Sequence, residues 1–543
     1  MLSTAVPVGI PDLTLVQLDP EGDWSSPDRG GVLVSSEAGS SGALNVRVAT
    51  TDRVSGVMLR WRRAIAEDVL VLGDAWERSY GDLQWRGMQP ERTLPWVALW
   101  HHAESRTTSG VGVEVRGGAF AGWTIDPEGF SLWLDLRCGG VAVRPGERVI
   151  DAAVIRGVSG TGSPFAVQQD LYSVLCTDPL LTGPLVGANN WYYAYGRDFG
   201  ETAVLRDAQT LSDLIGAHPV RPFAVVDDGW SVDGTADGRP GSGGPWDSAR
   251  SLSFPAGMQE TAQAVAELGV RPGIWFRPLL SRVRPNVGEL TRPRSDIFGA
   301  HVLDVSSSTT LQTVADDIAR FVDWGYELIK HDFSTFDLVG QWGLRMGTFP
   351  GRDGWSLSDP TVTTAEALVG FYRTIREAAG DAVILGCNVV GHLGAGLVHG
   401  QRVGDDTSGR IWSRTRRTGV NALAFRLAQH RRLFAVDADC VPSTPQTPWT
   451  QNRQWLDLVS RSGTALFVSV DPSTRNDALD ADLSIALRRA LDGGDPAGVE
   501  PLDWLHTTSP ARWRTGEGEL TYRWTEAWGS DPFEGFELAL QDH

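Results

Sequence analysis

The sequence predicts a multidomain α/β plus β protein. A central (β/α)8 TIM barrel lies between an N-terminal antiparallel β-sandwich and a small C-terminal β domain. Three observations support this fold class. The chain has 543 residues, which is more than one core usually holds. Its first third has short apolar runs between glycine and proline turns, as in a sandwich. Its middle alternates apolar segments with helical patterns, which is typical of parallel βα units.

Residues 1–176 are expected to form the β-sandwich, because runs of strand length recur there and long helical periodicity is scarce. The runs are Val32–Val34, Leu44–Val48, Val57–Trp61, Trp96–Trp100 and Phe130–Leu136. Thr177–Pro184 is expected to be a linker, since it combines proline, glycine and threonine.

Residues 185–477 are expected to form the barrel, because eight segments there run from apolar into polar residues. They are Phe223–Trp230, Pro272–Arg277, His301–Val305, Glu327–Phe333, Ala382–Asn388, Arg402–Asp406, Leu433–Asp439 and Ala465–Asp471. Helical spacing is found at 202–215, 259–268, 311–324, 363–379 and 421–434. A barrel keeps its active site at the carboxyl ends of its strands, so these segments predict an enzyme with carboxylate chemistry.

Two further segments complete the chain. Thr235–Trp246 is rich in glycine and is predicted to be a loop that overhangs the mouth of the site. Residues 478–543 are expected to form a small β-rich domain, with a helix at 483–491 and strands at 520–524 and 536–540.

The composition limits the partners. The net charge is −19, from 67 acidic and 48 basic residues, which argues against nucleic acid and anionic membranes as partners. No window reaches the roughly 18 apolar residues of a membrane helix, and the N-terminus is not a convincing signal peptide. Four scattered cysteines predict neither a disulfide framework nor a zinc site. A cytoplasmic protein is therefore expected.

Lys330 and Asp332 are the first candidate catalytic pair. Residues two apart in a strand point to the same face, so the lysine would keep the carboxylate ionised and nucleophilic. A structural ion pair at a strand end is an equally weighted interpretation.

Two aspartate pairs follow other predicted strands. Asp405 and Asp406 would repel each other, which can keep one protonated as a general acid; taken alone, a solvated turn is the favoured interpretation. Asp227 and Asp228, with Trp230, suit a sugar diol and a stacking surface, and an Asx-turn with helix capping is the alternative. Most of the 22 tryptophans are expected to pack in cores.

Four segments, taken in order, resemble α-galactosidases of glycoside hydrolase clan D. The likeness is nearer to the melibiase and raffinose-synthase type, family 36, than to the lysosomal type, family 27. The segments are Asp227–Trp230, Phe254–Met258 with Pro272–Phe276, Ile329–Asp332, and Gly404–Thr407. Together they cover the barrel, about half of the chain.

The resemblance implies retaining hydrolysis of terminal α-galactosides by double displacement, without metal or cofactor. Asp332 would be the nucleophile and Asp405 the acid/base, with Asp406 as the alternative because it fits an Arg-x-x-x-Asp spacing. The substrate, an oligosaccharide or glycoside, would be bound by six further side chains: Asp227, Asp228, Trp230, Trp275, Lys330 and Arg402. Of these, Lys330 would also support the nucleophile and Arg402 would orient the acid/base. Members of the family often form homo-oligomers.

Three positions depart from the family pattern. His331 stands where the family has Trp or Tyr, although strand alternation points it away from the pocket. Arg277 and Asn388 lie in altered turns that touch the sugar in relatives, so the exact sugar stays open.

Several alternatives remain at this stage. One is galactosyl transfer, and another is hydrolysis of an α-N-acetylgalactosaminide, an α-glucoside or a β-L-arabinopyranoside. A metal-dependent hydrolase would use His331, Asp332, His392, His399 and Asp405, but these lack the usual ligand spacing. A non-catalytic sugar-binding protein would make poor use of two strand-end acids and a lysine.

Overall fold

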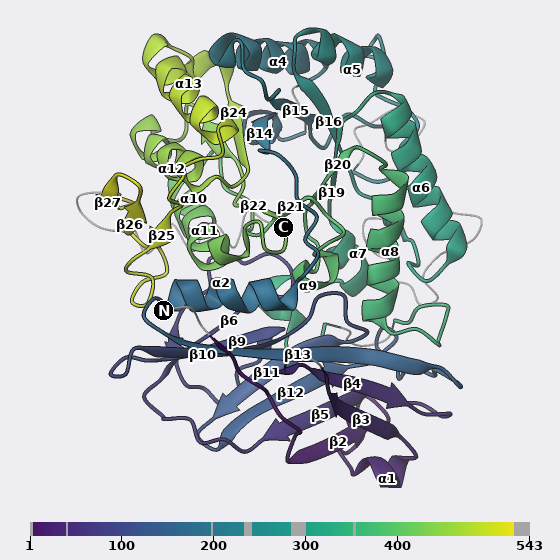
Figure 1. The fold of residues 1–543 in the computed structure, drawn as a ribbon. Coiled ribbons are helices and arrows are strands. Elements are labelled where there is room, and N and C mark those ends of the chain that lie inside the picture. Colours follow the sequence, from purple (N-terminus) through teal and green to yellow (C-terminus); the bar gives the residue numbers. More distant parts are fainter. Residues whose placement is uncertain are drawn as a thin grey trace.

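The computed structural model describes residues 4–39, 42–196, 199–232, 242–283, 300–350 and 355–525. Antiparallel sheets form one end of the molecule, and a curled parallel sheet surrounded by helices forms the other (Figure 1). The predicted strand at 536–540 and most of the predicted loop at 235–246 lie outside the described residues. None of the helices in the described ranges combines the length and the apolar character that a membrane span requires.

Two antiparallel sheets make up the N-terminal part. One has the order β3-β4-β13-β10-β9-β6-β7, with β1 also paired to β13, and the other has the order β2-β5-β12-β11-β8. The strands of the first sheet are β1 (Thr4–Ala5), β3 (Leu33–Ala38), β4 (Leu44–Ala49), β6 (Leu70–Gly73), β7 (Arg86–Gly87), β9 (Val97–His102), β10 (Thr107–Val113) and β13 (Val149–Thr161). Those of the second are β2 (Leu13–Gln17), β5 (Gly56–Trp61), β8 (Leu94–Pro95), β11 (Phe120–Asp126) and β12 (Gly129–Asp135). A short helix, α1 (Pro27–Gly30), follows β2.

The alternating runs form these sheets because one face of each strand is buried. Trp61 on β5 stands opposite Phe130 on β12, their ring centroids are 5.3 Å apart, and both side chains are buried. Burial of such large aromatic side chains is a main source of stability in a sandwich core. A helix that the sequence did not predict, α2 (Pro164–Leu175), lies between these sheets and the helical part (Figure 1).

The second part is built on a curled parallel sheet with the order β22-β21-β20-β19-β16-β15-β14-β24-β23. Its strands are β14 (Val186–Asn189), β15 (Phe223–Val226), β16 (Arg271–Phe276), β19 (Leu328–His331), β20 (Val383–Gly386), β21 (Gly400–Arg402), β22 (Ala435–Asp437), β23 (Val441–Ser443) and β24 (Leu466–Val470). Adjacent strands are parallel throughout.

The two ends of this sheet meet at an interrupted strand. β22 pairs with β21, and β23, three residues further on, pairs with β24. A parallel bridge between Asp437 and Ala465 also joins the end of β22 to the start of β24. The break between β22 and β23 contains Asp439, whose φ is 77°.

One predicted barrel strand was wrong. β18 (His301–Val302) pairs antiparallel with β17 (Leu280–Ser281), outside the parallel sheet. The polar end of this segment has a local role, because the Asp304 carboxylate accepts hydrogen bonds from the backbone N–H groups of Ser306 and Ser358.

β14 contributes a parallel strand that the sequence did not predict, since its residues follow a linker rich in proline and glycine. Its glycine is required by close packing. A Cβ at Gly187 would lie 1.9 Å from the Phe223 carbonyl oxygen on β15.

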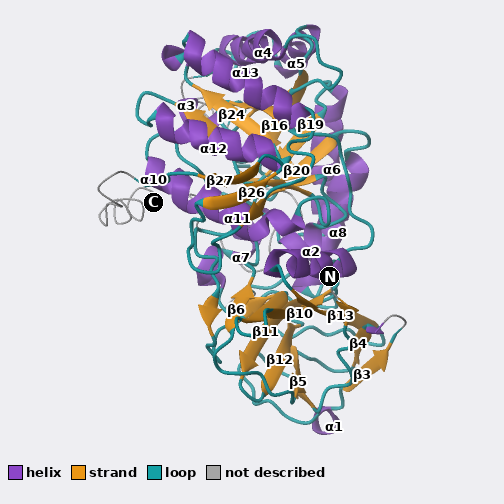
Figure 2. Cartoon of the chain, turned by 60° about the vertical axis from the view of Figure 1, so that its left-hand side comes forward, coloured by secondary structure: helices purple, strands orange, loops and turns teal. Residues whose placement is uncertain are grey.

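Helices cover the outer face of the parallel sheet (Figure 2). They are α4 (Glu201–Ile215), α5 (Met258–Glu267), α6 (Ser308–Asp323), α8 (Thr364–Ala378), α12 (Trp449–Ser462) and α13 (Asp477–Leu491). The first four confirm predicted helices. The predicted helix at 421–434 is shorter: α11 (Asn421–Arg426) passes into a 3-10 turn at Leu427–Gln429. α13 packs on α4 and α12, so this C-terminal helix belongs to the same layer.

Shorter elements sit at the ends of the sheet and after it. They are α3 (Trp191–Ala194), α7 (Ser334–Val339), α9 (Gly391–Gly394) and α10 (Trp412–Thr415), with a small antiparallel sheet of β25 (Glu500–Pro501), β26 (Arg512–Thr515) and β27 (Gly518–Thr521).

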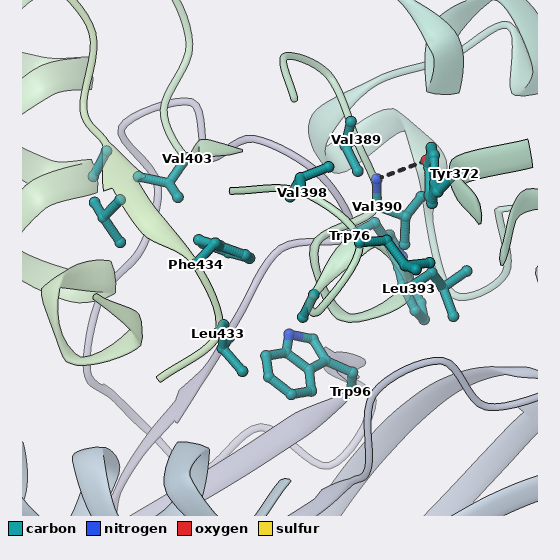
Figure 3. Close-up of a cluster of buried hydrophobic side chains, with 14 of the residues drawn as sticks. Trp76, Trp96, Tyr372, Val389, Val390, Leu393, Val398, Val403, Leu433 and Phe434 are labelled. Atoms are coloured by element: carbon teal, nitrogen blue, oxygen red, sulfur yellow. Dashed lines mark hydrogen bonds between the residues drawn. The ribbon is translucent and has the colours of Figure 1, made fainter. Parts of the chain in front are cut away.

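A continuous apolar core joins the two parts of the molecule. Trp76 and Trp96 from the N-terminal part and Leu393 and Phe434 from the helical part belong to one cluster of buried side chains (Figure 3). All four side chains are at most 4% exposed. Their packing places the connection between β6 and β7 against the carboxyl ends of the parallel strands.

Candidate active site

A pocket of about 420 Å³ lies at the carboxyl ends of the parallel strands. It brings together eight of the eleven side chains singled out from the sequence: Asp227, Asp228, Trp275, Lys330, Asp332, Arg402, Asp405 and Asp406. The strands β15, β16, β19 and β21 carry or precede these residues. Segments far apart in the sequence therefore converge at one edge of the sheet, as expected for a parallel α/β architecture.

Asp227 and Lys330 form a buried ion pair. The Lys330 ammonium lies 2.7 Å from Asp227 Oδ2, and the two side chains are 10% and 4% exposed. Asn189 on β14 also donates to Asp227 Oδ2. Burial alone would lower the pKa of Lys330, but the Asp227 carboxylate outweighs burial and raises it. The hydrogen-bond partner of Lys330 is thus Asp227, and not Asp332 as the sequence suggested.

Asp228 is the carboxylate best placed to meet a ligand. Its Oδ1 is buried and has no hydrogen-bond partner among the described residues, and the residue lines the pocket. Burial and the adjacent Asp227 raise the pKa of Asp228 to about 7. A buried polar atom without a partner is unfavourable, so a ligand hydroxyl group at this point would gain a hydrogen bond.

Asp332 follows β19 and is held by two donors. The Trp275 indole N–H lies 3.2 Å from Asp332 Oδ2, and the backbone N–H of Phe333 lies 2.6 Å from Asp332 Oδ1. The Phe333 backbone has a φ of 61°, which turns the chain sharply after the strand. These contacts fix the carboxylate at the pocket without neutralising it by a bonded cation.

Asp405 and Asp406 follow β21 and have different arginine partners. Arg414 lies 2.9 Å from Asp405 Oδ2, whereas Arg402 lies 2.6 Å from Asp406 Oδ1. Burial raises the pKa of Asp405 against the opposing effects of Arg78 and Arg414. Burial also acts on Asp406, but Arg402, Arg78 and Arg414 outweigh it and hold the pKa of Asp406 well below its ordinary value. The pair therefore combines one carboxyl whose pKa is raised and one whose pKa is lowered.

Asp439, in the break between β22 and β23, fixes this turn. Its Oδ1 lies 2.8 Å from Arg402, and its Oδ2 accepts hydrogen bonds from the Thr407 backbone N–H, the Thr407 hydroxyl and the Tyr192 hydroxyl. The sequence places Asp439 at a strand end, and this was the signal that could have found it.

Three predicted binding residues lie outside the pocket lining. Trp230 is fully buried and packs against Trp246, with ring centroids 5.7 Å apart. Arg277 pairs with buried Asp337. Asn388 donates to Glu77, with 2.7 Å between Asn388 Nδ2 and Glu77 Oε2. These placements give the three residues supporting roles behind the pocket, because their polar or aromatic groups are already engaged.

Nine lining residues were not singled out from the sequence. They are Arg78, Tyr80, Trp191, Tyr192, Phe333, Trp342, Gly343, Arg345 and Arg414. Arg78 and Tyr80 come from the connection between β6 and β7, in the predicted sandwich. No sequence pattern marks a residue that reaches a distant pocket from another part of the chain.

The histidines of the metal alternative lie elsewhere. The His331 ring lies beside Tyr372, with centroids 6.2 Å apart, away from the pocket as strand alternation predicts. His392 stacks on Trp96. Across the described ranges, no three His, Cys, Asp or Glu side chains are grouped as metal ligands would be.

A second hollow of about the same volume lies between α4 and α13. Two of its three carboxylates have partners within the fold: Asp480 pairs with Arg475, and Asp207 accepts from the Tyr193 hydroxyl.

Comparison with known proteins identifies the class of fold. No protein-family model matches the chain. A segment of 144 residues, 24% of this chain, is 33% identical to the α-galactosidase AgaA of Geobacillus stearothermophilus and spans 18% of that relative. The α-galactosidase TtGalA of Thermus thermophilus, solved with p-nitrophenyl α-D-galactopyranoside, superposes with a TM-score of 0.58 at 19% identity, covering 90% of this chain and 99% of that chain.

AgaA itself, a family 36 α-galactosidase, superposes with a TM-score of 0.57 at 13% identity, covering 88% of this chain and 75% of that chain. The structural neighbours are thus α-galactosidases, as the resemblance implied, and the chain shares their fold.

Proposed function

We propose that this protein is a retaining glycoside hydrolase that cleaves terminal α-galactosides. The observation that carries the proposal is that one pocket is lined by Asp332, by Asp405 and Asp406 of the turn after β21, and by Asp227, Asp228 and Lys330. Carboxylates in this number, with one favouring its proton, suit glycoside hydrolysis. Support also comes from TtGalA and AgaA, which have this fold and whose structures contain stachyose and raffinose.

In the first proposed step, a carboxylate oxygen of Asp332 attacks the anomeric carbon while the glycosidic C–O bond breaks. Asp405 gives its proton to the departing oxygen, so the leaving group departs as a neutral alcohol. Trp275 and the Phe333 N–H, which donate to Asp332, hold the attacking carboxylate in place.

In the second step, water attacks the anomeric carbon and displaces Asp332, and Asp405 takes the proton from that water. The two steps invert the same carbon twice, so the product keeps the configuration of the substrate. Asp405 is assigned as the acid/base because burial favours its protonated form, whereas Arg402 keeps Asp406 ionised.

Substrate contacts are assigned by placement. Asp227, Asp228 and Lys330 present oxygens and an ammonium that can bind sugar hydroxyl groups, and Trp275 forms part of the wall. The domain division at residues 176, 185 and 477 and the completed eight-stranded barrel belong to this proposal. The curled parallel sheet supports the barrel, and α13 (Asp477–Leu491), which packs on α4 and α12, extends its helix layer beyond residue 477.

The test is release of p-nitrophenol from a panel of α- and β-glycosides, with Asp332→Asn as the inactive control. Turnover of the α-galactoside and loss of more than 99.9% of it in Asp332→Asn would support the proposal. Preference for α-N-acetylgalactosaminide, α-glucoside or β-L-arabinopyranoside would change the sugar, and faster transfer to a sugar acceptor than to water would make the enzyme a transferase. A fully active Asp332→Asn variant would refute the mechanism.

Asp405 and Asp406 are distinguished by a second test. An acid/base variant keeps turnover of substrates with good leaving groups and is rescued by azide, which needs no base. We expect this behaviour for Asp405→Asn. Azide rescue of Asp406→Asn alone would move the role to Asp406.

A further inference from the structure

The segment Asp74–Leu83, between β6 and β7, leaves the N-terminal sheets and reaches the catalytic turn. Ser79 forms a parallel bridge with Gly404. Its N–H donates to the Val403 carbonyl at 2.9 Å, and the Asp405 N–H donates to the Ser79 carbonyl at 2.7 Å. The segment therefore adds a strand edge to the turn that carries Asp405 and Asp406.

Buried polar contacts fix the segment in this position. Arg426 of α11 lies 2.6 Å from Asp74 Oδ1 and donates to the Glu77 carbonyl at 2.6 Å. The Glu77 carboxylate, fully buried, accepts hydrogen bonds from the Tyr80 hydroxyl at 2.6 Å, the Gly343 N–H at 3.0 Å and the Asn388 amide at 2.7 Å. Trp76 anchors the start of the segment in the shared core (Figure 3).

This arrangement directs Arg78 into the pocket, between the two carboxylates. One guanidinium nitrogen lies 3.8 Å from Asp405 Oδ1 and another lies 3.4 Å from Asp406 Oδ1. The Arg78 side chain is 7% exposed, so solvent screens its charge weakly. Arg78 thus lies within 4 Å of both acids.

Other charged or titratable groups also face these carboxylates and Arg78. Those facing Asp405 and Asp406 are Arg402 from β21, Arg414 from α10, Tyr192 and Tyr195 from α3 and its end, and Tyr80 from the same segment as Arg78. Those facing Arg78 itself are Glu77, Tyr80 and Cys387. Arg402 and Arg414 belong to the helical part, so Arg78 is the cation that the N-terminal part adds to this set.

We propose that Arg78 is a positioning residue through which the N-terminal part controls the acid/base of the helical part: its cation determines how readily Asp405 releases its proton. The inference rests on the proposed function. Two carboxylates on adjacent residues in a buried turn favour sharing a proton, and a cation beside both of them favours its release. The carboxyl of Asp405 must both give up and take up a proton readily, because it acts as an acid in the first step and as a base in the second.

The sign of the effect follows from the charge. Without Arg78 the ionised form of Asp405 is less stable, so the carboxyl keeps its proton to a higher pH. An opposite charge at this distance shifts a carboxyl by about 1 to 3 pH units. Because kcat/KM requires the protonated acid, its basic limb moves upward. The acidic limb, which does not depend on Asp405, stays in place.

The experiment measures kcat/KM against pH for an aryl α-galactoside with wild type, Arg78→Gln and Arg78→Lys. Arg78→Gln should raise the basic limb by about 1 pH unit or more, and Arg78→Lys should restore most of the wild-type position. Ser79→Ala is the matched control, because it alters the same segment, keeps the backbone bridge and keeps the charge. A lower kcat in Arg78→Gln with both limbs unmoved would show a purely structural role and overturn the proposal.

Folding is kept separate from charge by a second variant. Arg78→Gln/Glu77→Gln removes the cation together with a buried carboxylate beside it, so a buried charge is not left behind. If Arg78→Gln does not fold, this double variant should show the same upward shift of the basic limb of kcat/KM.

The proposal is also separable from the proposed function. If wild type cleaves no glycoside, the proposed function fails, and the effect of Arg78 is then measured by 13C NMR of carboxyl-labelled aspartate. The Asp405 signal is assigned by its loss in Asp405→Asn. A higher titration midpoint for that signal in Arg78→Gln supports the proposal, and an unchanged midpoint contradicts it.

Discussion

Replacement of Asp228 by Asn should stabilise the protein, and more so as the pH rises. Asp228 lines the pocket, and its buried Oδ1 has no partner among the described residues. Burial and Asp227 raise its pKa from 3.8 to about 7. Because the folded state holds this proton more tightly than the unfolded state, the group lowers stability progressively as the pH rises from about 4 to about 7. An amide of the same shape does not ionise and avoids this loss.

The magnitude follows from the two pKa values. At pH 8 both states are ionised, and the full shift of about 3 units corresponds to roughly 4 kcal/mol. At pH 5 only the unfolded state is ionised, and the loss is between about 1 and 2 kcal/mol. The difference between the two pH values is thus about 2 to 3 kcal/mol. We expect about 2 kcal/mol, since Asp228 is only half-buried and solvent screens its charge.

The assay is thermal unfolding of wild type and Asp228→Asn between pH 5 and pH 8. The variant should gain about 3 °C more at pH 8 than at pH 5, because an unfolding entropy of about 2.1 cal/mol/K per residue gives about 1.6 °C for each kcal/mol in a part of about 290 residues. Asp381→Asn, an exposed aspartate before β20, controls for the chemical change. A stability difference that does not vary with pH would refute the account of Asp228. The variant should also lose activity, since the carboxylate is assigned to the substrate.

Two further predictions concern the fold that holds the site. Arg426→Met should destabilise the protein by about 3–5 kcal/mol in urea unfolding, because it leaves the buried Asp74 carboxylate without its cation. Arg512→Met breaks an exposed ion pair and should leave the urea midpoint unchanged. Equal effects of the two substitutions would contradict this reasoning. Gly187→Ala should prevent folding, as judged by yield and circular dichroism, because its Cβ would lie 1.9 Å from the Phe223 carbonyl oxygen. Gly370→Ala, where a Cβ meets nothing within 4 Å, should fold normally. A folded Gly187→Ala protein would contradict this reasoning and show that β14 and β15 can separate.

The strand ends could be predicted because their pattern is local. An apolar run that stops on a charged residue marks a buried strand whose end is solvated or used, and this placed Asp227, Lys330, Asp332 and Asp405 at one pocket. The same rule failed for His301–Val302, because a hairpin produces the same local pattern as a barrel strand. It also missed Val186–Asn189, whose small residues serve close packing of backbones and carry little apolar signal.

The contribution of the N-terminal part could not be predicted for a physical reason. Arg78 and Asp405 are brought together by packing of the antiparallel sheets against the helical part, and no sequence periodicity encodes that contact. Trp230 shows that a sequence motif can also assign a residue to a site that its side chain does not reach. Its neighbours Asp227 and Asp228 line the pocket, but its own ring is taken up by an aromatic core with Trp246, which a motif of four letters does not reveal.

The measurement that tests the central claim most directly is covalent trapping of the nucleophile. The protein is incubated with a fluorinated α-galactosyl fluoride that forms the glycosyl-enzyme quickly and hydrolyses slowly, and the mass is measured intact and after proteolysis. The account predicts one added fluorogalactosyl residue per chain, carried by the peptide with Asp332 and absent in Asp332→Asn. An adduct on another carboxylate, or turnover of galactosides without any adduct, would contradict it.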